Sequence, residues 1–173
     1  MSATDSLAAE VAALRARVER AEAALAIHNL KARYAQLVDE RYARGRVASD
    51  AVVAERAQAI AALFTDDGVW DGGPQLGVAR GRSEIAARLR APTLAFSWHF
   101  FVKPEIEVLS ADRARARWDI LSPFTSADGT PSWLAGVEDD EYARVGGVWL
   151  HASMKLTPVF VAPHATGWTR ILR

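Results

Sequence analysis

Three side chains of the kind that move protons in enzymes stand out in the sequence: Tyr34, Asp39 and His99. Tyr34 and Asp39 lie in RYAQLVDE, residues 33–40, near the end of a long helical pattern. Five residues correspond to about 500° of helix, so the two side chains point roughly 140° apart, and spacing alone does not direct both into one cavity. Both border an apolar arc of the helix. They either end a solvated helix or face a cavity, and the pattern leaves both interpretations open.

His99 lies in the apolar stretch FSWHFFVK. Alternation along a strand places His99 on one face with Phe101 and Lys103, and the residues between them on the other. An imidazole titrates near neutrality, and a neighbouring carboxylate would fix its tautomer, which suits a general base. The ordinary alternative is a histidine held by hydrogen bonds in the core.

Two further acidic positions are candidates for a cavity wall. Asp119 follows RARAR on a strand face that also carries three arginines, which is typical of a solvated strand but fits a cavity rim as well. Glu138 opens the acidic run Glu138–Glu141, which is normally a solvated segment. Alternation turns Glu138 and Asp140 to one side of the sheet and the residues between and after them to the other.

Other kinds of site are excluded or disfavoured. The chain has no cysteine, so disulfides and thiolate chemistry are excluded. GxGxxG, GxxxxGK and GxSxG motifs are absent, and the four histidines show neither HxH nor HExxH spacing. We therefore expect neither a metal nor an organic cofactor.

The bulk composition is that of a single globular domain. Half of the 173 residues are hydrophobic, and 21 basic residues balance 21 acidic ones. No charge excess indicates a nucleic-acid or membrane partner, and no apolar run has the length of a membrane span. A cytoplasmic protein with a small-molecule partner is the expectation.

The first half of the chain is predicted to be helical. A helical pattern runs over 6–44, with a heptad seam whose members are Leu7, Val11, Leu14, Val18, Ala21 and Leu25. This extension, residues 1–25, packs either on its own domain or on another subunit. The apolar stripe then changes register, which predicts a bend near Ala23–Ala26 and a stop at Gly45. Further helices are expected over 50–64 and 84–89, the last capped by Ser83.

From about residue 96 the pattern changes to strands. Four long segments, 96–109, 113–124, 132–145 and 148–161, are separated by turn-forming SADR, SADGTP and GG. Helices followed by antiparallel strands predict an α+β fold, with the helices on one face of a curved sheet around an apolar pocket. No repeat or linker divides residues 1–173, so one domain is expected.

Taken together, these segments resemble the SnoaL-like branch of the nuclear transport factor 2-like superfamily. The resemblance rests on IHNLKARYAQLVDE, IAALFTDDGVWDGG, GRSEIAARL, WHFFVKPEIEVLSADRARARWDI, AGVEDDEYARVGGVWLHASMKL and PHATGW. It implies a cone-shaped α+β fold. Within the branch, the chain looks most similar to the cofactor-free lyases of the bile-acid dehydratase, scytalone dehydratase and dehydrochlorinase group.

That resemblance implies roles for individual residues. An aspartate on the first helix and a histidine on the first long strand match Asp39 and His99, and a tyrosine five residues before the aspartate matches Tyr34. Asp119 falls near a further aspartate of the bile-acid enzymes. The candidates for substrate contact are Trp70, Phe101, Lys103, Asp119, Leu121, Glu138 and Met154. Departures at Tyr34, Lys103, Glu138 and Met154 argue against halide expulsion.

The predicted function is a cofactor-independent lyase that eliminates water from a hydrophobic aromatic or polycyclic molecule, with Asp39 and His99 as the acid–base pair. Retro-aldol loss of formaldehyde from a lignin-type diarylpropane, isomerisation and polyketide cyclisation use similar groups. A non-catalytic small subunit of a ring-hydroxylating dioxygenase is the main alternative from another class, and a ligand-binding protein without turnover is a third. The resemblance also implies a homo-oligomer, a trimer before a dimer.

Overall fold

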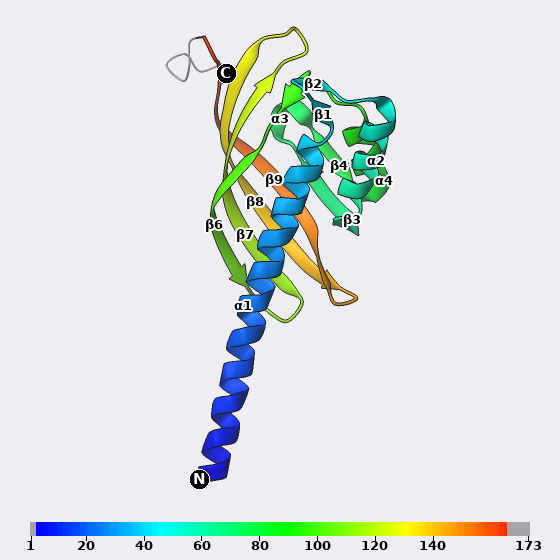
Figure 1. Cartoon of the computed structure of the whole chain (residues 1–173). Helices are drawn as coiled ribbons and strands as arrows, with labels where there is room; N and C mark the ends of the chain where they lie inside the picture. Colours follow the sequence, from blue (N-terminus) through cyan, green and yellow to red (C-terminus); the bar gives the residue numbers. More distant parts are fainter. Residues whose placement is uncertain (1–2, 166–173) are drawn as a thin grey trace.

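The structure is a computed structural model that describes residues 3–165, and these form a curved sheet with one long helix against its inner face (Figure 1). The helices are α1 (Ala3–Asp39), α2 (Asp50–Ala61), α3 (Gly73–Leu76) and α4 (Gly81–Arg90). The strands are β1 (Tyr42–Ala43), β2 (Arg46–Val47), β3 (Phe64–Asp71), β4 (Val78–Arg80), β5 (Phe96–Ser97), β6 (Phe100–Val108), β7 (Arg113–Thr125), β8 (Pro131–Val145) and β9 (Val148–Pro163). The predicted α+β class is confirmed.

The sheet follows the order β4-β3-β9-β8-β7-β5, and β6 pairs with the same edge of β7 as β5 does. Its pairs are antiparallel except β3 with β9. Burial alternates along β7 and β8, so Trp118 and Glu138 face inward while Asp119 and Val137 face outward. The inner face therefore carries the even-numbered residues of both strands.

Helix α1 is a single helix of 37 residues, without the predicted bend near Ala23–Ala26. The apolar stripe changes register there because the helix enters the domain: Ala23 is its first buried residue, and Ile27, Tyr34 and Val38 follow on the buried face. The helix also ends earlier than predicted, at Asp39. Arg44 and Gly45 both have positive φ and close the tight β1–β2 turn that follows.

The shorter helices differ slightly from the prediction. Helix α2 stops at Ala61 because the chain enters β3 at Phe64. Helix α4 starts at Gly81 rather than after Ser83, and its first turn is capped by Glu84, whose carboxylate accepts the Arg80 N–H at 2.9 Å. No helix in the described part of the chain is long and apolar enough to cross a membrane.

Two irregularities interrupt the strand predicted over 96–109. The ladder stops after Ser97 and resumes at Phe100, which leaves Trp98 and His99 outside it. Further along, Lys103 has φ 50° and the register with β7 shifts between Val102 and Glu105, as in a β-bulge. The first interruption places His99 at the candidate site, and the second turns the Lys103 side chain to the opposite face of the sheet.

Candidate active site

The end of α1 and the gap between β5 and β6 bring Asp39 and His99 together. The His99 ring Nδ1 lies 2.7 Å from Asp39 Oδ1, and the His99 backbone N–H donates to Asp39 Oδ2 at 3.3 Å. One carboxylate therefore holds both the ring and the main chain of the histidine. With Nδ1–H donated to Asp39, the neutral ring keeps its lone pair on Nε2, the atom that would accept a proton. The His99 ring also stacks on Phe101, with 6.1 Å between centroids.

Tyr34 lies on the same helix as Asp39, five residues before it, and its ring is buried. Its hydroxyl oxygen accepts a hydrogen bond from Trp70 Nε1 at 2.9 Å. Burial raises the pKa of Tyr34, an effect to which Glu138 adds, so the hydroxyl stays protonated. Because its oxygen already accepts from Trp70, the hydroxyl proton is available to a second partner.

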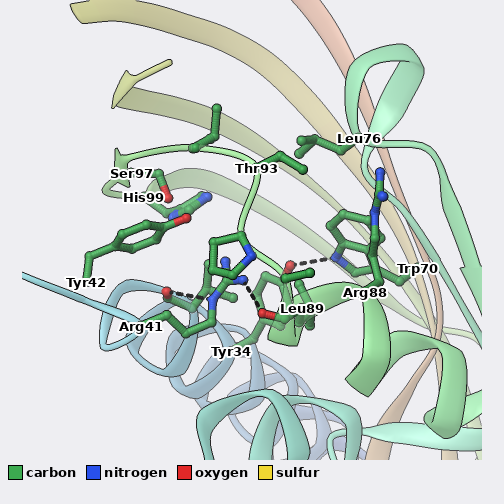
Figure 2. A pocket seen from close by; sticks show the side chains of 14 residues that line it. Tyr34, Arg41, Tyr42, Trp70, Leu76, Arg88, Leu89, Thr93, Ser97 and His99 are labelled. Atoms are coloured by element: carbon green, nitrogen blue, oxygen red, sulfur yellow. Dashed lines mark hydrogen bonds between the residues drawn. The ribbon is translucent and has the colours of Figure 1, made fainter. Parts of the chain in front are cut away.

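Two adjoining hollows meet at these residues. Figure 2 shows the first of them. Tyr34, Trp70, Ser97 and His99 line both. One hollow runs toward the turn after α1 and the end of α4, and is lined further by Val38, Arg41, Tyr42, Arg88, Leu89 and Thr93. The other runs along the inner face of the sheet, and is lined further by Ile120, Ser122, Phe124, Leu134, Glu138, Met154 and Leu156. The wall is mainly apolar, with a few polar groups, as in small-molecule sites.

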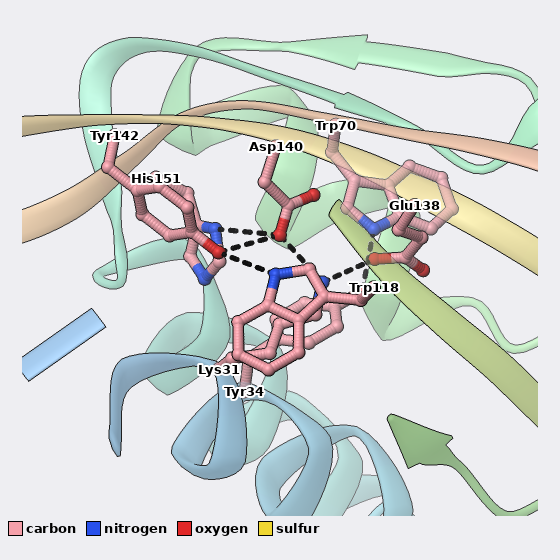
Figure 3. A network of polar contacts seen from close by, with 8 residues as sticks. All are labelled: Lys31, Tyr34, Trp70, Trp118, Glu138, Asp140, Tyr142 and His151. Atoms are coloured by element: carbon pink, nitrogen blue, oxygen red, sulfur yellow. Dashed lines mark hydrogen bonds and ion pairs between the residues drawn. The ribbon is translucent and has the colours of Figure 1, made fainter. Parts of the chain in front are cut away.

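Behind the second hollow, a buried ionic cluster joins α1 to β8 (Figure 3). Lys31 Nζ lies 2.5 Å from Glu138 Oε2 and 2.8 Å from Asp140 Oδ2. The Tyr142 hydroxyl donates to Asp140 at 2.8 Å and accepts from Trp118 Nε1 at 3.2 Å. The Phe101 ring lies 4.2 Å from Lys31 Nζ. Glu138 belongs to both regions, since it pairs with Lys31 and lines the hollow.

Burial and charge act against each other in this cluster. Burial by itself would lower the pKa of Lys31, but the two carboxylates outweigh it and the pKa is raised. Burial raises the pKa of Asp140 to about 6, although the Lys31 ammonium opposes the shift. Burial also raises the pKa of Tyr142 well above its ordinary value. Lys31 is therefore the fixed positive charge around which the carboxylates are arranged.

His151 completes this region. It is fully buried among the rings of Tyr34, Phe64 and Tyr142, and its Nδ1 lies 3.9 Å from Asp140 Oδ2. Within the described residues, neither ring nitrogen has a hydrogen-bond partner. Burial, together with the Lys31 charge, lowers the pKa of His151 well below its ordinary value. The ring is therefore neutral in the folded protein.

The structure places five of the predicted site residues together at the hollows: Tyr34, Trp70, His99, Glu138 and Met154. Phe101 lies behind them, between His99 and Lys31, and is not a lining residue. Asp39 holds His99 from the side. The structure therefore brings Asp39, His99 and Tyr34 to one region of the cavity wall.

Three predicted contacts do not face the cavity. Lys103, Asp119 and Leu121 lie on the outer face of the sheet, where Lys103 Nζ forms an ion pair with Asp119. Strict alternation predicts that Lys103 points inward with His99, but the bulge at Val102–Glu105 turns it outward. Asp119 and Leu121 are odd-numbered residues of β7, the face that the arginines share. The ordinary interpretation of RARARWD as a solvated strand face is correct.

Sequence reasoning missed two basic residues of this region. Lys31 sits on the buried stripe of α1 between Ile27 and Tyr34, so a charged residue on an otherwise apolar stripe is the signal that could have identified it. Arg41 lies in the turn after α1, is buried and lines the first hollow. Its position carries no periodic signal. In the described part of the chain, no three His, Asp or Glu side chains are grouped closely enough to hold a metal ion.

The fold and this arrangement define a cone-shaped α+β domain with an internal, mainly apolar cavity. The chain belongs to the SnoaL-like domain family, whose sequence model matches residues 19–155. No sequence among the curated proteins matches the chain. The predicted family is therefore confirmed, while the activity needs its own evidence.

Solved structures with the same fold include a dehydrochlorinase and a protein assigned as a dehydratase. The hexachlorocyclohexane dehydrochlorinase LinA-type3 from Novosphingobium barchaimii LL02 is 21% identical over 86% of this chain and 94% of that one, with a TM-score of 0.70. A protein of Novosphingobium aromaticivorans DSM 12444 assigned as a scytalone dehydratase is 18% identical over 86% and 91%, with a TM-score of 0.69. An NTF2-like protein with a cystatin-like fold from N. aromaticivorans is 23% identical over 92% of both chains, with a TM-score of 0.59. At these identities the likeness shows the NTF2-like fold.

Proposed function

We propose that the chain is a cofactor-independent lyase that eliminates water from a hydrophobic aromatic or polycyclic hydroxy compound. One observation carries the proposal: Asp39 holds His99 by both ring and backbone at the wall of an apolar cavity, with the Tyr34 hydroxyl on the same wall. This is the geometry of an oriented base beside a hydrogen-bond donor. Two of the structural neighbours are a dehydrochlorinase and a protein assigned as a dehydratase, which supports an elimination.

In the proposed reaction, His99 Nε2 takes a proton from a carbon next to the one that bears the hydroxyl. The electron pair of the broken C–H bond forms the carbon–carbon double bond, and the C–O bond breaks. The departing hydroxyl leaves as water: it takes a proton from Tyr34, or it takes one from the His99 imidazolium while Tyr34 donates only a hydrogen bond to a substrate oxygen. Asp39 stabilises the imidazolium that forms. Positioned acid–base groups of this kind contribute on the order of a hundred- to ten-thousand-fold in rate.

The test compares wild type with Asp39→Asn in a mass-spectrometric screen without added metal or cofactor. Hydroxysteroids, hydroxylated polyketide-like ketones and lignin-derived diarylpropanes form the panel. We expect loss of water that depends on the aspartate, because the asparagine amide of the variant would donate an N–H to Nδ1 and leave the ring proton on Nε2, where a lone pair is needed. Loss of formaldehyde instead would assign a deformylating lyase. Turnover at an unchanged rate in the variant would rule out the pair.

A further inference from the structure

The cavity has a cationic end that the proposed elimination does not use. Arg41 follows Asp39 by two residues and is only 6% exposed. Its Nε donates to the Val38 carbonyl at 3.1 Å and its Nη1 to the Leu89 carbonyl at 2.9 Å. A guanidinium has five N–H donors, so these two bonds leave three of them for other partners.

No acidic side chain neutralises this arginine. Among residues 3–165, no carboxylate forms a salt bridge with Arg41. A buried charge without a counter-ion is costly, and an anion that enters the cavity would remove that cost. The guanidinium lines the first hollow beside Tyr42, Ser97 and His99 (Figure 2), so such an anion would reach it directly.

The rest of this hollow favours an anion as well. Its described lining contains a second arginine, Arg88, and the hydroxyl groups of Ser97 and Thr93, and it contains no carboxylate. The acidic residues Asp71 and Glu138 line only the other hollow. The two ends of the cavity therefore differ in charge, and Tyr34, Trp70 and His99 lie on the wall that they share.

We propose that the Arg41 end of the cavity binds a carboxylate group of the substrate, so that the substrate is a hydrophobic hydroxy acid. The free N–H groups of a guanidinium match the two oxygens of a carboxylate in a bidentate pair. That this carboxylate belongs to a substrate rests on the proposed elimination. The binding site itself does not, since it follows from the burial and the unpaired charge of Arg41.

The test uses two probes of one shape, 2-naphthoate and the neutral 2-naphthamide, titrated by calorimetry into wild type and into Asp39→Asn. We expect the carboxylate to bind at least about tenfold more tightly than the amide in both proteins. In Arg41→Gln this preference should vanish through weaker carboxylate binding, with amide binding unchanged. Arg90→Gln, which removes an exposed arginine of α4, is the matched control and should keep the preference.

The wild-type comparison of the two probes needs no variant, so it decides the matter even if Arg41→Gln does not fold. Equal affinity for the two probes would overturn the carboxylate site, as would an equal loss in Arg90→Gln. A carboxylate preference without turnover of any panel compound would leave the site standing and the lyase proposal failed. Turnover of a panel compound without a preference for the carboxylate probe would support the lyase proposal and overturn the carboxylate site.

A second, independent inference concerns the part of α1 outside the domain, which extends away from the sheet (Figure 1). All members of its heptad seam are exposed; the large ones, Leu7, Val11, Leu14, Val18 and Leu25, are 37–61% exposed, and Ala21 lies between them. Leu25 and Ile27 are two residues apart, about 200° around the helix, and Ile27 is buried in the domain. The seam therefore faces away from the domain, where a second helix would meet no obstruction from it.

The seam has the features of a two-stranded parallel coiled coil. Spacing assigns Val11, Val18 and Leu25 to a positions and Leu7, Leu14 and Ala21 to d positions. Valine at a with leucine at d is the combination that favours two parallel strands. In such a pair each g position faces the e position five residues later on the other helix. Glu10 would then face Arg15 of the second copy, and Arg17 would face Glu22, so both contacts are attractive.

We infer that the partner of this seam is a second copy of the chain, joined in a parallel coiled coil. Because the sequence has no cysteine, Leu14→Cys introduces a single thiol at a d position, where two copies in register bring their Cα atoms within disulfide reach. We expect a disulfide-linked dimer from mild oxidation of Leu14→Cys but not of Ala13→Cys, whose side chain points away from the seam. Equal cross-linking of the two variants, or none, would overturn the inference, as would a monomeric or trimeric mass of wild type by sedimentation equilibrium.

Discussion

The Asp39–His99 pair and the Lys31 cluster use the same chemical groups for different purposes. In the cluster, Lys31 contacts two carboxylates, and a tyrosine and a tryptophan complete the network away from solvent. In the pair, one carboxylate contacts Nδ1 of an imidazole that lines the cavity, and Nε2 is the nitrogen that this contact leaves free of Asp39. Polar groups that are satisfied by one another stabilise a fold, whereas a group held on one side only is available to a ligand.

Replacement of His99 tests the first half of this comparison and should have the largest effect. We expect His99→Gln to lower turnover by a factor of about a hundred to ten thousand, because the base is lost. Stability should change by less than about 1 kcal/mol, since the side chain contacts the cavity rather than filling the core. Steady-state kinetics and urea unfolding measure the two quantities. A large loss of stability with little loss of rate would assign His99 to the fold.

Replacement of Lys31 should give the opposite result. Lys31→Met leaves the buried carboxylates of Glu138 and Asp140 without their cation, a change that typically costs about 3–5 kcal/mol of unfolding free energy. The triple variant that also carries Glu138→Gln and Asp140→Asn should recover part of this loss, because no buried charge remains. Urea unfolding of the two variants measures the difference. Equal stability of the two would show that the charges are not the cause.

His151 should give the cluster a pH dependence of its own. Its lowered pKa means that only the unfolded chain takes up its proton as the pH falls below about 6.5, so the histidine destabilises the fold in acid. Relative to His151→Phe, the wild type should lose up to about 1.4 kcal/mol for each pH unit from 6.5 down to 5. The rise of the Asp140 pKa to about 6 acts in the opposite direction, but both proteins share it and it cancels in the difference. Unfolding at four pH values measures the difference, and a constant value would contradict the account.

The ion pair between Lys103 and Asp119 should have the smallest effect. Lys103 is 76% exposed on the outer face, so Lys103→Ala should change stability by no more than about 1 kcal/mol and leave turnover unchanged. Activity on the panel compound that wild type converts best is the measurement. A turnover loss of tenfold or more would return Lys103 to the site, where strand alternation alone would place it.

These positions also show what a sequence can and cannot predict here. The three strands after residue 112 follow the prediction closely, because alternation and turn residues are local signals. The bend predicted in α1 was wrong, because a stripe that changes face needs no change in the helix when the helix leaves one environment and enters another. Lys103 was misplaced by a single inserted residue, and Arg41 was missed because its burial depends on a helix 48 residues away. Long-range partners of this kind leave no local pattern.

The gap between β5 and β6 has a consequence for how such a protein changes over evolution. Asp39 holds both the main chain and the ring of His99, so the pair is built from the end of α1 and the gap between β5 and β6. Leu134, Met154 and Leu156 line the cavity from other elements, β8 and β9. Their replacement alters the shape of the accepted molecule and leaves the proton-transfer geometry in place. Descendants of one ancestor can therefore keep the Asp39–His99 pair and still differ in the substrate that they accept.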